Sequence, residues 1–368
     1  MATTRFTTNS NETVKLWAKR TIEEALRQSV VGLLKGKDED AFIQIVTEAN
    51  KDKGDRVRNT LVAQFTGEGK QGSETLKGDE ESLTTYTQDL VLDQQRHAFK
   101  FEQGISAQRV SFDQKEVGRR RLSDWWADRI SQAALLQLAG YTGTDITGTK
   151  RTGNNTASAP DANHIIRGGA AANDESCNDS NEAPTLALID QCVAKAEAFS
   201  LADGNGAPIR PGNFMGEMAY AFICHPYFWY EMKRQTGTGE FVDLTKAFYQ
   251  GSKAENPLVK GSLKGKTRVV GYYNGVYILT DPRCPKGVHS STGAPVSNTR
   301  RGVFLGAQSA WMGFGVGFDD EKMRWNEEED DYGNLLGLAA TSVWGLIKSR
   351  YNAIDFGSIV VTAYTSLG

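Results

Sequence analysis

The sequence has no run of apolar residues long enough to cross a bilayer, and its first residues, MATTRFTTNSNE, lack the charged-then-apolar layout of a signal peptide. Its four cysteines never form a Cys-x-x-Cys pair, and its four histidines have no spacing in which metal ligands converge. These absences argue against a membrane protein, a disulfide scaffold and a zinc site. We therefore expect free thiols and a chain that is made and used in a cytosol.

The sequence also has almost no excess of charge of one sign. The formal net charge is -3 over 368 residues, with a pI near 5.9. Such a balance creates no general attraction for polyanions, so bulk electrostatics do not indicate a nucleic-acid-binding protein. A hydrophobic content of 39% with 24% charged residues is typical of a globular protein, and the length allows about two or three domains.

Two glycine-containing stretches match parts of nucleotide-binding motifs. GEGKQG, Gly67–Gly72, fits G-x-G-x-x-G, but the helix that should follow it is replaced by a strand-like pattern. KGSLKGKT, residues 260–267, ends like a Walker loop but has lysine where the first glycine belongs. We predict no cofactor, no metal and no enzymatic activity, and we keep a nucleotide-binding enzyme using Gly67–Gly72 as an alternative.

The segment from residue 56 to residue 104 predicts a long hairpin. Residues 56–65 read as one strand, the polar stretch 66–82 as its tip, and LTTYTQDLVLDQQRHAFKFE as an extended return. Ten paired residues would project the tip by about 33 Å. Because an isolated two-stranded hairpin is only marginally stable in water, we expect its own domain or a neighbouring subunit to cover it.

Two helical patterns flank this hairpin. Residues 13–34 predict an amphipathic helix whose polar side carries four basic residues, Lys15, Lys19, Arg20 and Arg27. From 106 to 139 the apolar residues recur at threes and fours, which predicts a helix about 50 Å long that Gly118 bends or breaks.

The remainder alternates strands and helices. Residues 141–184 predict a long loop rich in Gly, Thr and Asn, followed by a helix to residue 199. MAYAFIC predicts a buried strand that leads through His225 into a helix, where we favour a structural histidine over a general base. Asn274 and Gly275 predict a hairpin turn. The acidic cluster 327–331 predicts a solvated or partner-facing edge rather than a divalent-cation site.

Several stretches, taken in order, resemble the major capsid proteins of tailed double-stranded DNA phages, specifically a podovirus-type family with the HK97-like fold. They are LKGDEESLTTYTQDLVLDQQRHAF at 76–99, SFDQKEVGRRRLSDWWADRI at 111–130, AFICHPYFWYEMK at 221–233, GYYNGVYILTDPRCP at 271–285, GVFLGAQSAWMGFG at 302–315 and DYGNLLGLAATSVWGLIKSRYNAIDFGSIVV at 331–361.

The resemblance implies an α+β fold with defined parts. These are an N-terminal arm (1–55), an extended hairpin loop (56–104), a spine helix of the peripheral domain (105–140) and a loop or insertion (141–184). They continue with an axial domain plus remaining peripheral strands (185–345) and a C-terminal strand that returns to the peripheral domain (346–368).

The resemblance also implies a function. Copies of the chain form hexamers and pentamers of an icosahedral shell around phage DNA in a virion assembled in the bacterial cytoplasm. The shell has a portal and, in some phages, scaffold or decoration proteins. An encapsulin-like compartment is an alternative. Candidate intersubunit residues are Gly67, Lys70, Lys77, Asp79, Glu80 and Glu81; candidates that face the lumen and its DNA are Lys15, Lys19, Arg20 and Arg27.

Overall fold

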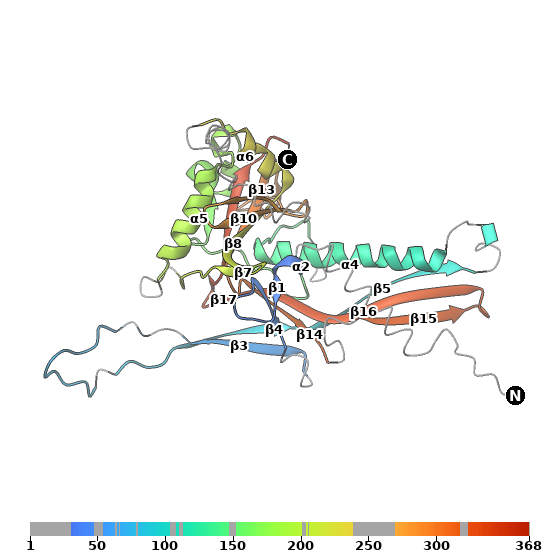
Figure 1. Cartoon of the computed structure of the whole chain (residues 1–368), viewed down its shortest axis with the longest axis horizontal. Helices are drawn as coiled ribbons and strands as arrows, with labels where there is room; N and C mark the ends of the chain where they lie inside the picture. The colour runs from blue at the N-terminus through green and yellow to red at the C-terminus, as the bar shows by residue number, and fades with distance from the viewer. Residues whose placement is uncertain are drawn as a thin grey trace.

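In the computed structural model, one long helix and two mixed sheets form the body of the protein, and a two-stranded hairpin projects from it (Figure 1). The structure describes residues 31–47, 54–62, 65, 67–78, 80–103, 108–109, 113–146, 152–200, 204, 206–237, 269–316 and 323–367. Residues 13–30 of the helix predicted over 13–34, which include its four basic residues, and the stretch 260–267 lie outside these residues. Within them, helices and strands are both present, as predicted for an α+β fold.

The long helix is α4 (Gln114–Leu138), which is shorter than the helix predicted over 106–139. Asp113 is extended (φ -72, ψ 107), and its carboxylate accepts hydrogen bonds from the N–H groups of Lys115 and Glu116, so the helix begins after it. Its 25 residues span about 37 Å. Gly118 does not break it: a Cβ atom there would lie 1.8 Å from the ring of Phe99, so glycine makes room for that ring.

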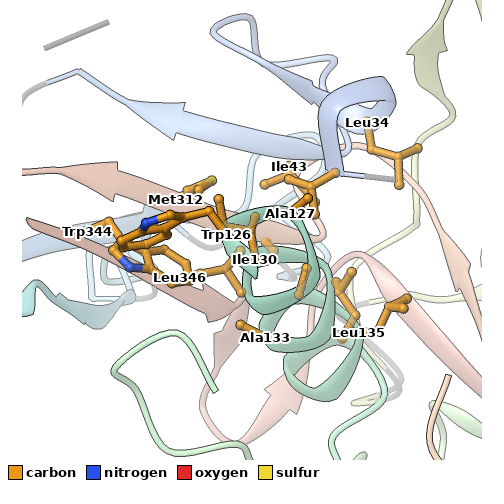
Figure 2. Close-up of a cluster of buried hydrophobic side chains, with 14 of the residues drawn as sticks. Leu34, Ile43, Trp126, Ala127, Ile130, Ala133, Leu135, Met312, Trp344 and Leu346 are labelled. Carbon is orange, nitrogen blue, oxygen red and sulfur yellow. The ribbon is translucent and has the colours of Figure 1, made fainter. Parts of the chain in front are cut away.

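A six-stranded sheet packs against α4, and together they form the first lobe. Its order is β1 (Lys35–Gly36), β2 (Ile43–Val46), β14 (Ala310–Phe314), β16 (Leu335–Lys348) and β15 (Arg324–Asp330), with β5 (Asp93–Glu102) on the other edge of β16. Figure 2 shows Trp126 and Ile130 of α4 beside Met312, Trp344 and Leu346 of the sheet. The short helix α2 (Val31–Leu34) adds apolar side chains to the same core. This apolar layer fixes α4 along the sheet.

A seven-stranded sheet forms the second lobe. Its order is β6 (Ile165–Arg167), β19 (Ser358–Tyr364), β13 (Thr299–Leu305), β8 (Glu217–Cys224), β10 (Val276–Thr280) and β9 (Val269–Tyr273), with β7 (Gly212–Phe214) paired to β8. The helices α5 (Leu186–Ala198) and α6 (Pro226–Arg234) cover it through a second apolar core. The predicted strand 218–224 and the helix after it are both present.

Two local predictions in this lobe are confirmed. Asn274 and Gly275 both have positive φ (45° and 77°) and turn β9 into β10. His225 caps α6, since its ring nitrogen Nδ1 accepts a hydrogen bond from the N–H of Tyr227 at 3.1 Å. Burial, with a smaller contribution from Arg300, lowers the pKa of His225 to about 4, which keeps the ring neutral as an acceptor requires.

The C-terminal segment differs from its predicted position. We expected 346–368 to return to the peripheral domain, which contains the spine helix, but β19 pairs antiparallel with β13 over seven residues and parallel with β6, in the second lobe. Its residues are almost all buried, because a strand in the middle of a covered sheet needs apolar groups on both faces. Of residues 346–368, only residues 346–348, which are the end of β16, belong to the sheet under α4. The turn between them carries β17 (Arg350–Tyr351) and β18 (Ile354–Asp355).

The stretch 141–184 is irregular, as predicted, but it packs between the lobes. It contains β6 and three 3-10 helices, η3 (Gly168–Ala170), η4 (Asp174–Ser176) and η5 (Ser180–Glu182). Asp174 is buried and pairs with Arg167 and Arg301. Arg301 of β13 also donates to the carbonyl oxygens of Ala139 and Gly140 at the end of α4. The segment therefore joins the long helix to the second lobe. A small ladder, β11 (Gly287–Val288) with β12 (Pro295–Val296), adjoins η4.

The projecting hairpin consists of β3 (Arg56–Val62) and β4 (Thr85–Val91), paired antiparallel over seven residues (Figure 1). It is shorter than the ten pairs predicted, at about 23 Å. The predicted single return strand is divided at Leu92: β4 belongs to the hairpin, whereas β5 pairs with β16 over ten residues. The hairpin thus leaves the body where the chain changes sheets.

Candidate intersubunit surfaces

The predicted contact residues lie together at the hairpin tip. Gly67, Lys70, Lys77, Glu80 and Glu81 are all exposed, and Asp79 lies outside the described residues. The N–H of Gly67 donates to the Glu81 carboxylate at 2.9 Å, and the N–H of Gly78 donates to the Glu80 carboxylate at 2.7 Å. Backbone hydrogen bonds from its own N–H and from Gly78 lower the pKa of Glu80. These bonds order the tip locally.

Exposed apolar side chains accompany this polar tip, and sequence reasoning did not single them out. Val62, Phe65, Leu76 and Leu83 are between 55% and 60% exposed. In the sequence, Leu76 and Leu83 are isolated within a polar stretch, whereas Val62 and Phe65 belong to the apolar run LVAQF that ends the predicted strand. Single exposed apolar residues are ordinary, but four of them on one projecting arm form a surface that gains free energy when a partner covers it.

The geometry does not support a phosphate loop at Gly67–Gly72. The described residues 67–78 and 80–84 contain turns and extended backbone, with no helix whose N-terminus points at the glycines. Among the described residues, no group of three or more His, Cys, Asp and Glu side chains is arranged to hold a metal ion. The four cysteines are free and buried. No described helix is long and apolar enough to span a membrane.

The root of the hairpin approaches β16 very closely. At Gly345 a Cβ atom would lie 2.1 Å from the carbonyl oxygen of Val91, so only glycine admits β4 at this distance. Farther along, the Gln88 amide donates to the carbonyl of Lys348 (2.8 Å) and accepts from the N–H of Arg350 (3.0 Å). Side-chain bonds therefore replace a regular backbone ladder between β4 and the end of β16.

Asn155 completes this connection. Its side-chain oxygen accepts from the N–H of Val91 at 3.0 Å, and its NH₂ group lies 3.0–3.2 Å from the carbonyl oxygens of Val91, Gly153 and Leu346. The residue is 5% exposed, so water does not compete freely for these groups. One amide thus bridges the hairpin to the sheet. Asparagine suits this position because its side chain carries the same donor and acceptor as a peptide group.

A buried charge cluster lies behind the hairpin root. Lys348 Nζ is 2.7 Å from the carboxylate of Asp355, and both side chains are at most 1% exposed. Burial lowers the pKa of Lys348 and raises that of Asp355, while their mutual attraction opposes both changes. Burial also acts to raise the pKa of Asp161, but bonds from His164 and backbone N–H groups outweigh it and hold that pKa well below its usual value. The cluster anchors the β17–β18 turn.

An apolar groove runs between α4 and β5. Phe99, Phe101, Val117, Leu122 and Trp125 line most of it. His97 stacks on Trp125 with ring centroids 4.1 Å apart, and burial, assisted by Arg129, lowers the pKa of His97. Val117 is exposed, so this groove opens on the surface of the body.

The acidic cluster 327–331 lies on β15 and in the turn after it, at the edge of the six-stranded sheet. Glu327 packs inward and pairs with Lys115 of α4 at 2.8 Å, and Asp330 pairs with Lys100 at 2.6 Å. Glu328 and Glu329 are exposed. The cluster therefore combines two ion pairs within the chain with a charged outer edge.

Comparisons with known proteins agree with this architecture. The family model described as phage capsid protein matches residues 5–367. The chain is 28% identical to the major capsid protein of Pseudomonas phage KPP25, over 97% of this chain and 96% of that one. It is similar to the capsid of Ralstonia phage GP4 (TM-score 0.73, 24% identity, 92% of each chain) and to the cyanophage Pam1 capsid (TM-score 0.69, 14% identity, 93% of each chain). These structures have the HK97-like fold.

Proposed function

The chain belongs to the phage capsid protein family, and we propose that it is the major capsid protein whose copies assemble into an icosahedral shell around the double-stranded DNA genome of a tailed phage. Its place is then the virion, and its role is structural rather than enzymatic. We further propose that assembly takes place in the bacterial cytoplasm, from hexamers and pentamers, with a portal and, where present, scaffold or decoration proteins.

The observation that carries this proposal is the outstretched hairpin with its uncovered apolar side chains. Val62, Phe65, Leu76 and Leu83 lie on an arm that reaches away from both cores (Figure 1). Full burial of such a side chain contributes about 1.5–3 kcal/mol, and slightly over half of its surface is still exposed here. An arm of this kind gains most of its stability from a neighbouring copy, as intersubunit elements do.

The groove between α4 and β5 is the surface that we propose receives this tip on the neighbouring copy. It offers aromatic and aliphatic side chains from Phe99, Phe101, Val117 and Trp125. Apolar side chains that enter such a groove exclude water from both surfaces. Lys70, Lys77, Asp79, Glu80 and Glu81 would then form the polar rim of the contact. In this proposal, Lys15, Lys19, Arg20 and Arg27 face the lumen and its DNA.

The test is expression of the chain followed by electron microscopy and sedimentation. The paired substitutions Phe65→Ser and Leu83→Ser should reduce the yield of shells about tenfold or more, because each removes an apolar contact that forms only on assembly. The unassembled subunit should keep its melting temperature, since both side chains are exposed in it.

The control is Leu367→Ser, a comparably exposed apolar residue in the second lobe near the C-terminus. Deletion of residues 66–82 should abolish shells altogether. The proposal is wrong if the purified wild-type chain remains monomeric under all assembly conditions, or if shells form normally without the tip.

A further inference from the structure

Two open strand edges of the protein have opposite charge. Within the described residues, β15 pairs only with β16, so its outer edge is uncovered. In the same part of the chain, the pairing found for β3 is with β4 alone, and the other side of β4 faces β16 and β17 through Gln88. The outer edge of β3 is therefore also uncovered.

The side chains along these edges differ in sign. The exposed face of β15 begins with one cation, Arg324, and continues with Asn326, Glu328 and Asp330; Glu329 is also exposed. The exposed face of β3 carries Arg56, Arg58, Thr60 and Val62. Arg58 already pairs with Asp89 of β4, and Asp330 with Lys100. Arg56 and Glu328 take part in neither of these two ion pairs, although Asp89 also attracts Arg56.

Within one copy the two edges are far apart. In Figure 1 the hairpin of β3 lies toward one end of the long axis, and β15 runs toward the other end. A contact between them must therefore join two copies of the chain. Because it uses different surfaces on the two partners, it is a head-to-tail contact, which closes into rings when the rotation permits.

We propose that β3 of one copy adds to the open edge of β15 on a neighbouring copy, with Arg56 beside Glu328. Antiparallel pairing with Arg56 opposite Glu328 joins residues 56–60 to residues 324–328, so it would run over five residues, about 17 Å. Strand addition supplies backbone hydrogen bonds, and the side chains decide which edges meet. This inference rests on the proposed function and names the second contact that the same hairpin makes.

The charges also disfavour some wrong pairings. Two β15 edges in parallel register would place Glu328 against Glu328, and two β3 edges would place Arg56 against Arg56. Like charges directly opposite each other on paired strands are destabilising. Charged edge strands are a known protection against indiscriminate pairing. The opposite charges of Arg56 and Glu328 therefore favour the contact between β3 and β15 over these pairings.

The test is a charge swap. R56E and E328K should each lower the yield of shells about tenfold, since each places like charges together. The double variant R56E/E328K should restore the yield to within about threefold of wild type, because the pair is then reversed rather than broken. The control is E197K, the same reversal on the exposed face of α5. It should have no effect.

Each outcome is decisive. The inference is wrong if the double variant gives no higher yield of shells than the weaker single variant, or if both single variants give full yield. In either case, wild-type shells would still support the proposed function. Full yield from both single variants would mean that the acidic side chains of β15 only prevent unwanted pairing at a solvent-exposed edge. If a reversal unfolds the subunit, R56Q and E328Q are compared instead, with an expected loss of about threefold each and no loss if the inference is wrong.

Discussion

The amide of Asn155 supplies hydrogen bonds to the attachment of the hairpin, beside the apolar contacts of Leu90 and Leu92, so Asn155→Ala should loosen that attachment specifically. The substitution removes one acceptor, used by the N–H of Val91, and one NH₂ group shared among the carbonyls of Val91, Gly153 and Leu346. It leaves these backbone groups in a site with little access to water. It changes no charge.

The magnitude follows from these bonds. The two NH₂ hydrogens and the one acceptor make about three effective hydrogen bonds, each with a net contribution of about 0.5–1.5 kcal/mol. We therefore expect a loss of about 3 kcal/mol in the free energy of local opening at the hairpin root. An opening that is 3 kcal/mol easier is populated roughly a hundredfold more.

The assay is hydrogen exchange at the amide of Val91, read by mass spectrometry or NMR on the unassembled subunit. Its exchange should accelerate by about a hundredfold in Asn155→Ala. Amides in β13 and β19 should be unaffected, because their ladder in the second lobe remains intact. Asn155→Asp, which keeps the size but loses the donors and adds a charge, should be at least as disruptive.

The control is Asn178→Ala, an exposed asparagine of the same irregular segment. The reasoning would be refuted if Asn155→Ala changed the exchange of Val91 by less than about threefold, or if Asn178→Ala had the same effect. Either result would mean that the close approach at Gly345 holds the hairpin without the amide.

Two further substitutions test other contacts. Gly118→Ala places a Cβ atom 1.8 Å from the ring of Phe99, so we expect a loss of about 2 kcal/mol in unfolding free energy, seen as a lower melting temperature. An unchanged melting temperature would show that the ring moves aside freely. Arg301→Ala leaves Asp174 buried without its main partner and should cost about 3–5 kcal/mol in urea unfolding, whereas Arg121→Ala on the surface of α4 should cost under 1 kcal/mol. Burial acts to raise the pKa of Asp174, but Arg301 and Arg167 outweigh it and leave the folded pKa below its usual value of 3.8. The stabilisation is therefore full above about pH 4 and is lost as the pH falls below it, and Asp174→Asn should remove this part of the pH dependence of unfolding.

Much of the fold was accessible from local patterns. The strand 217–224, the helix after His225 and the turn at Asn274 were predicted because each has a strong local signal: a continuous apolar run, a proline at the first turn, or an Asn-Gly pair. The hairpin was predicted from two extended stretches around a polar tip. Its length was overestimated, since the pairing in the described residues ends at Val62 and Thr85.

Other features depend on contacts between distant segments. The start of α4 was placed too early because Asp113 can occupy a helix interior as well as a cap, and only its bonds to Lys115 and Glu116 decide between the two. The position of β19 follows from its pairing with β13, which no local pattern encodes. The role of Asn155 depends on Val91 and Leu346, which are 64 and 191 residues away in sequence.

The attachment of the hairpin through Gln88 and Asn155 has a mechanical consequence. A backbone ladder resists tilting because many bonds must lengthen together, whereas an amide at the end of a side chain turns about its χ angles while its bonds persist. We therefore expect the arm to change its inclination more easily than a strand inside either sheet, within the limits set by the apolar contacts of Leu90 and Leu92 at its root. A closed surface built from one kind of subunit needs tight curvature at its vertices and gentler curvature between them, and a pivot at this position lets identical chains fit both.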